Sequence, residues 1–248
     1  MQELERLEGR HAVLEALKAG LKLEKVLVQK DLKESLGQEV KEAAKAAGFP
    51  VQFLDKEKLD GMSRSGRHQG ILAEMKAIPY SSVEEMLAAA REKGEAPFLL
   101  LLDGIEDPHN LGAIIRTAHQ AGAHGVIIPK NRAAGLTATV ARVSAGALAY
   151  LPVAQVTNLA RTMEELKKEG LWFVCADMSG EVMYRQNLTG PIGLVIGNEG
   201  EGVSRLVKEK CDIIASIPMH GDIDSLNASV AAGVLAFEIV RQRMAKAK

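Results

Sequence analysis

The sequence has few cysteines, few aromatic residues and no excess of charge of either sign. Its two cysteines, Cys175 and Cys211, form no C-x-x-C pair, which excludes a disulfide framework and the usual zinc-ligand spacings. Aromatic residues make up 4% of the chain, too few for rows of stacking platforms that bind single-stranded nucleic acid. The net charge of −1 excludes a polybasic arm that binds phosphate by bulk attraction. A nucleic-acid partner would therefore need a local basic patch.

Long apolar runs and common nucleotide-binding motifs are also missing. No apolar run approaches the roughly 20 residues of a membrane span, and the acidic amino terminus MQELERLEGR differs from a secretory signal. We therefore expect a cytoplasmic protein without membrane contact. The chain has no G-x-x-x-x-G-K-[ST] motif, and no G-x-G-x-x-G follows the first apolar run of its larger half, which disfavours a nicotinamide dehydrogenase. No metal is expected, because these histidines lack metal-ligand spacing: His11, His109, His119, His124 and His220.

The hydrophobic pattern divides the chain into three parts. Hydrophobic residues make up 47% of the 248 residues, enough for one large core or for one medium and one small core. Residues 1–76 mix helical stretches with short apolar runs and predict a small α/β domain. Residues 77–96 predict a linker that carries an amphipathic helix. In residues 97–248, short apolar runs alternate with helical stretches, which is typical of a parallel sheet covered on both faces in a doubly wound α/β domain.

The last helix, expected from Leu226 to Met244, is unusually apolar. Its apolar residues form two adjoining stripes, which make too wide a surface for a helix with one free face. We therefore expect part of this surface to contact another subunit. The stripes contain Leu226, Val230, Val234 and Phe237, and Ala231, Leu235 and Ile239.

Three polar loops follow expected strands, where open α/β sheets bind their ligands. In DGIEDPHNLG (103–112), Pro108 ends the strand, Asn110 is placed to cap the next helix and Arg116 follows about two turns later. In GNEGEGVS (197–204), the glycines allow a close approach of the backbone to a ligand or to another chain segment.

Glu199 lies between those glycines, and its carboxylate could simply face the start of a helix near Val203. In the third loop, IPMHGDIDSLNAS (217–229), Asp224 or Ser225 is a natural cap and Asn227 lies in the first turn of the last helix. Each loop alone fits an ordinary turn. Their coincidence in one domain predicts a ligand site.

The same segments resemble the SpoU, or TrmH-like, branch of the SPOUT methyltransferases, which methylate RNA at the ribose 2′-hydroxyl. The likeness is carried in order and spacing by NLGAIIRTA (110–118), LVIGNEGEGVS (194–204) and IPMHGDIDSLNASVAA (217–232). GRHAVLEAL (9–17) and HQGILAEM (68–75) extend it over almost the whole chain. It is greatest to the RlmB-type enzymes, which act on a guanosine ribose in the peptidyl-transferase region of bacterial 23S rRNA.

The resemblance implies a fold and a cofactor that residue patterns alone do not give. The implied fold is a parallel sheet whose carboxyl-terminal segment threads through a loop as a deep trefoil knot, preceded by a ribosomal-protein-like RNA-binding domain. The implied cofactor is S-adenosylmethionine, and the implied assembly is a homodimer that binds RNA between its subunits. Carried over by position, the cofactor-binding residues are Gly197, Ile217, Met219, Leu226 and Asn227.

The chemistry requires the ribose oxygen, the methyl carbon and the sulfonium sulfur to be aligned. The resemblance assigns this task to Arg116 and Asn110, with support from Glu199, Ser225 and Asn227. Because arginine stays protonated at accessible pH, we expect Arg116 to clamp a phosphate beside the target ribose rather than to remove a proton. The resemblance further implies that Arg116 can serve the donor of the partner subunit.

The expected RNA contacts are basic residues in both domains. They are Arg64, Arg67 and His68 in the small domain, and Lys130, Arg132 and Arg142 in the large one, although each is equally well an ordinary solvated charge. The target is 23S rRNA in the first interpretation and tRNA or another rRNA position in the second. A non-catalytic RNA-binding protein of the same fold is the third. Residues 1–76 favour rRNA, and the intact third motif favours catalysis.

Overall fold

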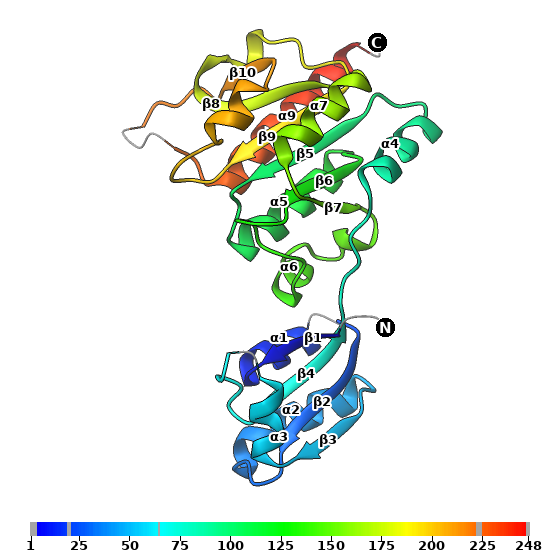
Figure 1. Cartoon of the computed structure of the whole chain (residues 1–248), viewed down its shortest axis with the longest axis vertical. Coiled ribbons are helices and arrows are strands. Elements are labelled where there is room, and N and C mark those ends of the chain that lie inside the picture. The colour runs from blue at the N-terminus through cyan, green and yellow to red at the C-terminus, as the bar shows by residue number, and fades with distance from the viewer. Residues whose placement is uncertain (1–3, 19–20, 64, 222–224, 247–248) are drawn as a thin grey trace. The chain divides into compact units, whose positions relative to one another are not determined.

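The computed structural model describes residues 4–18, 21–63, 65–221 and 225–246. The chain divides into two compact units (Figure 1). The first comprises residues 1–79 together with 136–142, and the second comprises residues 80–135 together with 143–248.

The first unit is built on a mixed sheet in the order β1-β4-β2-β3. Strand β4 is antiparallel to β1 and β2, whereas β2 is parallel to β3. The core lies between this sheet and the apolar faces of α1 and α2, and includes Val13, Val26 and Val40. The bounds are β1 (Leu4–Glu8), α1 (Arg10–Lys18), β2 (Leu23–Gln29), α2 (Glu34–Ala46), β3 (Val51–Leu54), α3 (Lys56–Met62) and β4 (Ile71–Lys76).

The second unit is built on a parallel sheet in the order β10-β8-β9-β5-β6-β7 (Figure 1). Its strands are β5 (Phe98–Asp103), β6 (Gly125–Pro129), β7 (Val153–Val156), β8 (Trp172–Val182), β9 (Ile192–Gly197) and β10 (Ile213–Ser216). Its helices are α4 (Val83–Glu92), α5 (Pro108–Gln120), α7 (Leu159–Lys168), α8 (Arg205–Glu209) and α9 (Ala228–Lys246). Most of α6 (Ala138–Val143) belongs to the first unit, and short 3-10 turns span Ala147–Ala149 and Met183–Arg185.

Helices cover both faces of this parallel sheet, as the uninterrupted apolar strands require. On one face, Met86 of α4, Met163 of α7 and Val207 of α8 pack with alternate residues of the strands, such as Leu101 and Val195. Helix α9 contacts β8 and β9, and α5 packs against α9 and contacts β6. The predicted α/β class with a parallel sheet is therefore confirmed.

Two helices begin at other residues than the sequence predicted. Helix α5 begins at Pro108, and its cap is Asp107, whose carboxylate accepts a hydrogen bond from the His109 backbone N–H at 2.9 Å. Asn110 is therefore not the cap but lies inside the first turn. Helix α9 begins at Ala228, so the expected cap at Asp224 or Ser225 is too early; Asp224 lies outside the described residues.

The described part of the chain contains neither a candidate membrane-spanning helix nor a candidate metal site. None of its helices is long and apolar enough to cross a membrane. No group of His, Cys, Asp and Glu side chains there could hold a metal ion.

Candidate active site

A pocket of about 460 Å³ opens where β9 and β10 end and where β8 continues beyond its pairing with β9. The glycine-rich loop that follows β9 forms one wall, and the beginning of α9 forms another. The lining consists of Ala176, Asp177, Met178, Ile196, Gly197, Asn198, Glu199, Gly200, Glu201, Gly202, Ala215, Ile217, Met219, Ser225, Leu226, Ala228, Ala231 and Leu235.

The glycine-rich loop folds back tightly on itself. A Cβ atom at Gly197 would lie 2.1 Å from the carbonyl carbon of Gly202, so only glycine fits there. Gly202 has a φ of +69°, in the left-handed region that glycine occupies without strain. The Asn198 side-chain oxygen accepts hydrogen bonds from the backbone N–H groups of Gly200 at 2.9 Å and Glu201 at 2.7 Å. These contacts fix the backbone that lines the pocket.

Three side chains from the three polar loops form one hydrogen-bonded cluster beside the pocket. Asn110 Nδ2 donates to Glu199 Oε1 at 2.6 Å. Asn227 Nδ2 donates to Asn110 Oδ1 at 2.9 Å and to Glu199 Oε1 at 3.1 Å. The structure thus brings together Asn110, Glu199 and Asn227, which are far apart in the sequence.

Glu199 also accepts a hydrogen bond from the backbone N–H of Ala228 at 3.2 Å. Its carboxylate therefore faces the amino-terminal end of α9, where the helix dipole favours a negative charge. The sequence had suggested instead a helix near Val203, but α8 begins only at Arg205. The helix that Glu199 faces is α9, which follows the third loop and is distant from Glu199 in the sequence.

Asn227 is held by α9 itself. Its Oδ1 atom accepts hydrogen bonds from the backbone N–H of Ser229 at 3.0 Å and from the Ser229 hydroxyl at 2.5 Å. Because the oxygen is used at the helix start, the amide nitrogen is directed toward Asn110 and Glu199. Asn227 therefore combines the role of a helix cap with that of a cluster member.

Arg116 and Ser225 remain accessible. Arg116 lies exposed on α5, and its guanidinium forms no hydrogen bond or ion pair with any side chain or backbone group of the described residues. Ser225 is exposed and lines the pocket. A free, permanently charged guanidinium is suited to bind an anionic group of a ligand.

The charge of the pocket fits a cationic ligand with an apolar part. Asp177, Glu199 and Glu201 line it, and its described lining contains no lysine, arginine or histidine. Burial raises the pKa of Asp177, but hydrogen bonds from Lys208 and Ser179 outweigh this effect and hold the pKa below its ordinary value. The sulfonium and ammonium groups of S-adenosylmethionine match these carboxylates, and the apolar side chains Ile196, Ile217, Leu226 and Leu235 match its adenosine.

Of the residues predicted to contact the cofactor, Gly197, Ile217, Met219 and Leu226 line the pocket, whereas Asn227 lies in the adjoining cluster. The sequence analysis missed Asp177 and Asn198. Asp177 could have been found by the same rule as the others, because it directly follows the apolar run LWFVCA. Nothing local in the sequence indicates that Asn198 shapes the loop.

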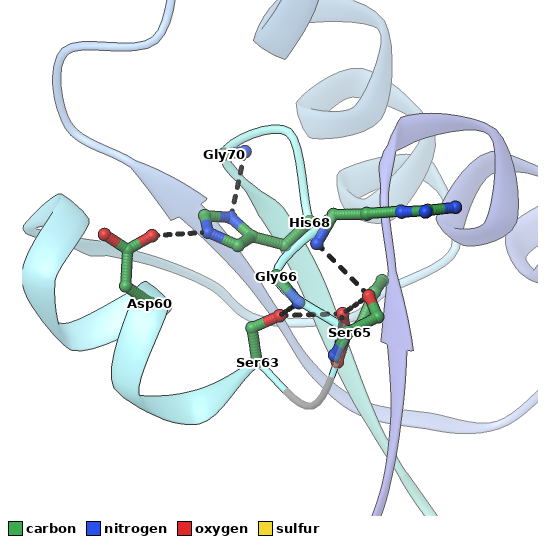
Figure 2. A network of polar contacts seen from close by, with 8 residues as sticks. Asp60, Ser63, Ser65, Gly66, His68 and Gly70 are labelled. Carbon is green, nitrogen blue, oxygen red and sulfur yellow. Dashed lines mark hydrogen bonds and ion pairs between the residues drawn. The ribbon is translucent and has the colours of Figure 1, made fainter.

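The polar loop of the first unit is shown in Figure 2. Arg64 lies outside the described residues, whereas Arg67 is exposed and its backbone N–H donates to Ser65 Oγ at 3.2 Å. His68 is only 5% exposed: its Nδ1 accepts from the Gly70 N–H at 3.0 Å, and its Nε2 lies 2.7 Å from Asp60 Oδ1. The expectation of direct RNA contact by His68 is therefore revised to a role in holding the loop.

The other basic candidates are exposed, and two of them are paired with carboxylates. Arg132 Nη2 donates to Glu201 Oε2 at 3.0 Å, and Arg142 Nη1 donates to Glu15 Oε2 at 2.7 Å. Lys130 is exposed at the end of β6. Exposed ion pairs contribute about 0–1 kcal/mol, so a phosphate group can readily replace either carboxylate.

Comparison with known proteins agrees with this geometry. Residues 97–237 match the SpoU rRNA Methylase family, and residues 6–81 match the RNA 2′-O ribose methyltransferase substrate binding family. YacO of Bacillus subtilis, named for the TrmH family of tRNA/rRNA methyltransferases, is 50% identical over 95% of this chain and 94% of its own length.

Two solved structures share the fold. The SpoU methyltransferase AviRb from Streptomyces viridochromogenes, in complex with AdoMet, is 26% identical with a TM-score of 0.65, over 97% of this chain and 91% of its own. The A. aeolicus TrmH/SpoU tRNA modifying enzyme is 29% identical with a TM-score of 0.56, over 66% of this chain and 85% of its own. The chain therefore belongs to the SpoU rRNA methylase family and is an S-adenosylmethionine-dependent RNA 2′-O-ribose methyltransferase.

Proposed function

We propose that this enzyme methylates the 2′-hydroxyl of a guanosine in the peptidyl-transferase region of bacterial 23S rRNA. The observation that carries the choice of rRNA is the first unit, which matches a substrate-binding family over residues 6–81. In contrast, the match to the A. aeolicus tRNA modifying enzyme covers only 66% of this chain. The choice of guanosine as the target nucleoside rests on the resemblance of the three motifs to RlmB-type enzymes. In this proposal residues 1–76 bind RNA and residues 97–248 carry catalysis. The connection is shorter than the expected linker 77–96, because residues from 80 on belong to the second unit and Met86 of α4 is buried in its core.

The proposed site divides donor binding from activation of the hydroxyl. When bound, S-adenosylmethionine supplies a methyl group on a positively charged sulfur. Gly197, Ile217, Met219 and Leu226 hold the donor, largely through main-chain atoms, because the pocket wall at Gly197 is backbone rather than side chain.

Arg116 clamps the phosphate beside the target ribose and lowers the effective pKa of the hydroxyl. The hydroxyl proton leaves to water as the new oxygen–carbon bond forms and the carbon–sulfur bond of the donor breaks. Asn110, Glu199 and Asn227, with Ser225 at the pocket, orient the ribose through their shared cluster. Substituting Arg116→Lys tests the clamp, because lysine cannot form a planar bidentate contact. We expect a slower reaction with an unchanged shape of the pH profile. A flattened pH profile without loss of rate would contradict the clamp.

We further propose a cytoplasmic homodimer of knotted chains, in which Arg116 serves the donor of the partner subunit. Helix α9 supports the dimer, because Val230 and Phe237 are each 49% exposed and Met244 is 67% exposed along one stripe. Mixing an Arg116→Ala chain with a Glu199→Ala chain should restore part of the activity. Mixed dimers without any recovery would contradict a shared site.

The target is tested by mapping ribose methylation on rRNA and tRNA from cells that lack this chain. We expect one guanosine mark in the peptidyl-transferase region to disappear and to return with the wild-type chain but not with Glu199→Ala. Loss of a tRNA mark, or of a mark elsewhere in rRNA, would contradict the proposed target.

A further inference from the structure

A second hollow, of about 200 Å³, lies where β5, β6 and β7 end in the second unit. It shares Asn198, Glu201 and Gly202 with the donor pocket, so the glycine-rich loop forms a wall of both cavities. No residue of the proposed donor set or of the Asn110 cluster lines it. The carboxyl ends of parallel strands are where open α/β sheets bind ligands, which makes this hollow a candidate for a second ligand group.

The lining of the hollow combines an apolar surface with a polar rim. Leu159, Ala160, Leu206 and Val207 provide the apolar surface, and Leu206 is 56% exposed although it is a large apolar side chain. The rim carries Asp103, Asn131, Asn158 and Arg132. A flat aromatic ring with hydrogen-bonding edges and a nearby negative charge fits this combination.

Two rim groups have hydrogen-bonding capacity left. Asn158 uses its oxygen to cap α7, accepting from the Arg161 N–H at 3.0 Å, and its amide N–H groups find no acceptor in the described part of the chain. Asp103 accepts from the Ser204 N–H at 2.8 Å through Oδ2, and its Oδ1 atom accepts no bond from the described residues. The rim thus presents a donor and an acceptor to a bound ring.

Arg132 has an unusual backbone. Its φ of +55° lies in the left-handed region, which is uncommon for a residue other than glycine and is often retained at functional sites. The loop around it is fixed on both sides, by a hydrogen bond from Lys130 N to Val156 O and by one from Ala134 N to Ile105 O, both 2.8 Å. The fold therefore fixes the backbone from which the Arg132 side chain reaches the rim of the hollow.

The present partner of Arg132 is weakly held. The Arg132 and Glu201 side chains are 68% and 75% exposed, and an exposed pair of this kind is easily exchanged for another anion. A phosphate offers arginine a bidentate contact of higher charge. Because Glu201 also lines the donor pocket, a phosphate at Arg132 would release a carboxylate toward the donor.

We propose that this hollow binds an unpaired nucleotide of the RNA substrate, with its base on Leu206 and its phosphate on Arg132. Sequence-specific RNA recognition uses unstacked bases packed on side chains, with hydrogen bonds at their edges. The inference rests on RNA as the substrate and not on the choice of 23S rRNA. A methylation map that pointed to tRNA would overturn the proposed target and leave this inference intact.

The test measures binding of a fluorescein-labelled, unstructured hexaribonucleotide containing 4-thiouridine to the full chain at fixed low salt. Arg132→Ala and Leu206→Ser should each weaken binding about tenfold, while the affinity for S-adenosylmethionine stays unchanged in both. Matched controls are Arg205→Ala, a 92% exposed arginine outside the hollow, and Trp172→Ser, a 60% exposed apolar residue outside it. Both controls should change binding less than twofold.

Photo-crosslinking of the same hexamer gives a second readout that does not depend on affinity. Crosslinked peptides should contain residues 158–160 or 204–207. The proposal is overturned if both hollow variants bind as tightly as the wild type, if Arg205→Ala causes an equal loss, or if the crosslinks lie elsewhere. Thermal unfolding of each variant shows whether a loss of binding reflects a loss of fold.

Discussion

The polar loop of the first unit and the glycine-rich loop of the second use their polar groups differently. In the first, His68 is buried between the Gly70 N–H and Asp60 (Figure 2). Ser63 Oγ there donates to Glu8 Oε2 at 2.7 Å. In the second, Glu199 is exposed, and its carboxylate accepts hydrogen bonds from the amide side chains of Asn110 and Asn227, which belong to other segments. The first network holds a loop in shape, whereas the second concentrates donors and acceptors beside a pocket. We therefore expect changes in the second loop to affect catalysis and changes in the first to affect RNA affinity.

The largest effect is expected from Gly197→Ala, which tests whether backbone forms the donor pocket. Its Cβ would lie 2.1 Å from the Gly202 carbonyl carbon, whereas a Cβ at Gly200 would lie 3.5 Å from Asn198 Oδ1, an ordinary contact. Gly197→Ala should abolish measurable S-adenosylmethionine binding in calorimetry, and Gly200→Ala should bind within a few-fold of the wild type. Equal affinities for the two variants would contradict a tightly folded loop.

Glu199→Ala should reduce the turnover number about 100-fold or more. The change removes the shared acceptor of Asn110, Asn227 and the Ala228 N–H, and misplacing a reacting group by about 1 Å can cost that much. Glu209→Ala is the matched control, because Glu209 is an exposed acid of the same unit that pairs with Arg205. Transfer of labelled methyl to RNA under single-turnover conditions measures the effect. A loss shared equally by both variants would show that only surface charge matters.

His68→Ala should act on the other loop. It leaves the Gly70 N–H without its acceptor, which costs about 1–3 kcal/mol for a buried group, and it frees the segment that carries Arg67. We expect a several-fold weaker RNA affinity with unchanged S-adenosylmethionine affinity, measured by anisotropy and calorimetry. Asp60→Asn, which keeps a side-chain oxygen near the His68 Nε2, should show a smaller effect. If His68→Ala also changed the affinity for S-adenosylmethionine, the two loops would not have the separate roles proposed here.

The smallest effect concerns His124, a buried histidine of the second unit. Its Nδ1 accepts from the Phe98 N–H at 3.1 Å, and burial lowers its pKa more than the neighbouring carboxylate of Glu95 raises it. Because the unfolded chain binds the proton more readily, the unfolding free energy should fall as the pH drops below about 6.5. His124→Asn, which keeps an acceptor for Phe98, should flatten this part of the stability profile. Denaturant unfolding at a series of pH values measures it, and an unchanged slope would contradict the assignment.

The α/β class and the parallel sheet could be predicted from the sequence because they depend on local patterns of apolar residues. Continuous apolar runs in residues 97–248 predicted strands, and one of them, IGLVIG, forms β9, since a strand covered on both faces needs no polar alternation. The resemblance to the SpoU branch, which local motifs carry, assigned Gly197, Ile217 and Leu226 to the cofactor, and the structure places them around one pocket.

The errors come from contacts between distant segments. Strand β1 was not predicted, because its place depends on pairing with β4, in which Leu4 lies opposite Lys76. The cap of α5 was assigned to Asn110 because both Asp107 and Asn110 are good caps, and the choice is made by the fold of the loop. The spacing of residues in the sequence does not predict that Glu199 faces α9 or that Arg132 pairs with Glu201.

The most direct test of the donor pocket is backbone hydrogen exchange of the wild-type chain with and without S-adenosylmethionine. We expect the donor to slow exchange at residues 196–202 and 215–219 and at the start of α9, with little change at residues 65–70. Protection confined to residues 65–70 or to the ends of β6 and β7, or no protection anywhere, would contradict the assignment of the pocket beside Glu199 as the site that binds the methyl donor.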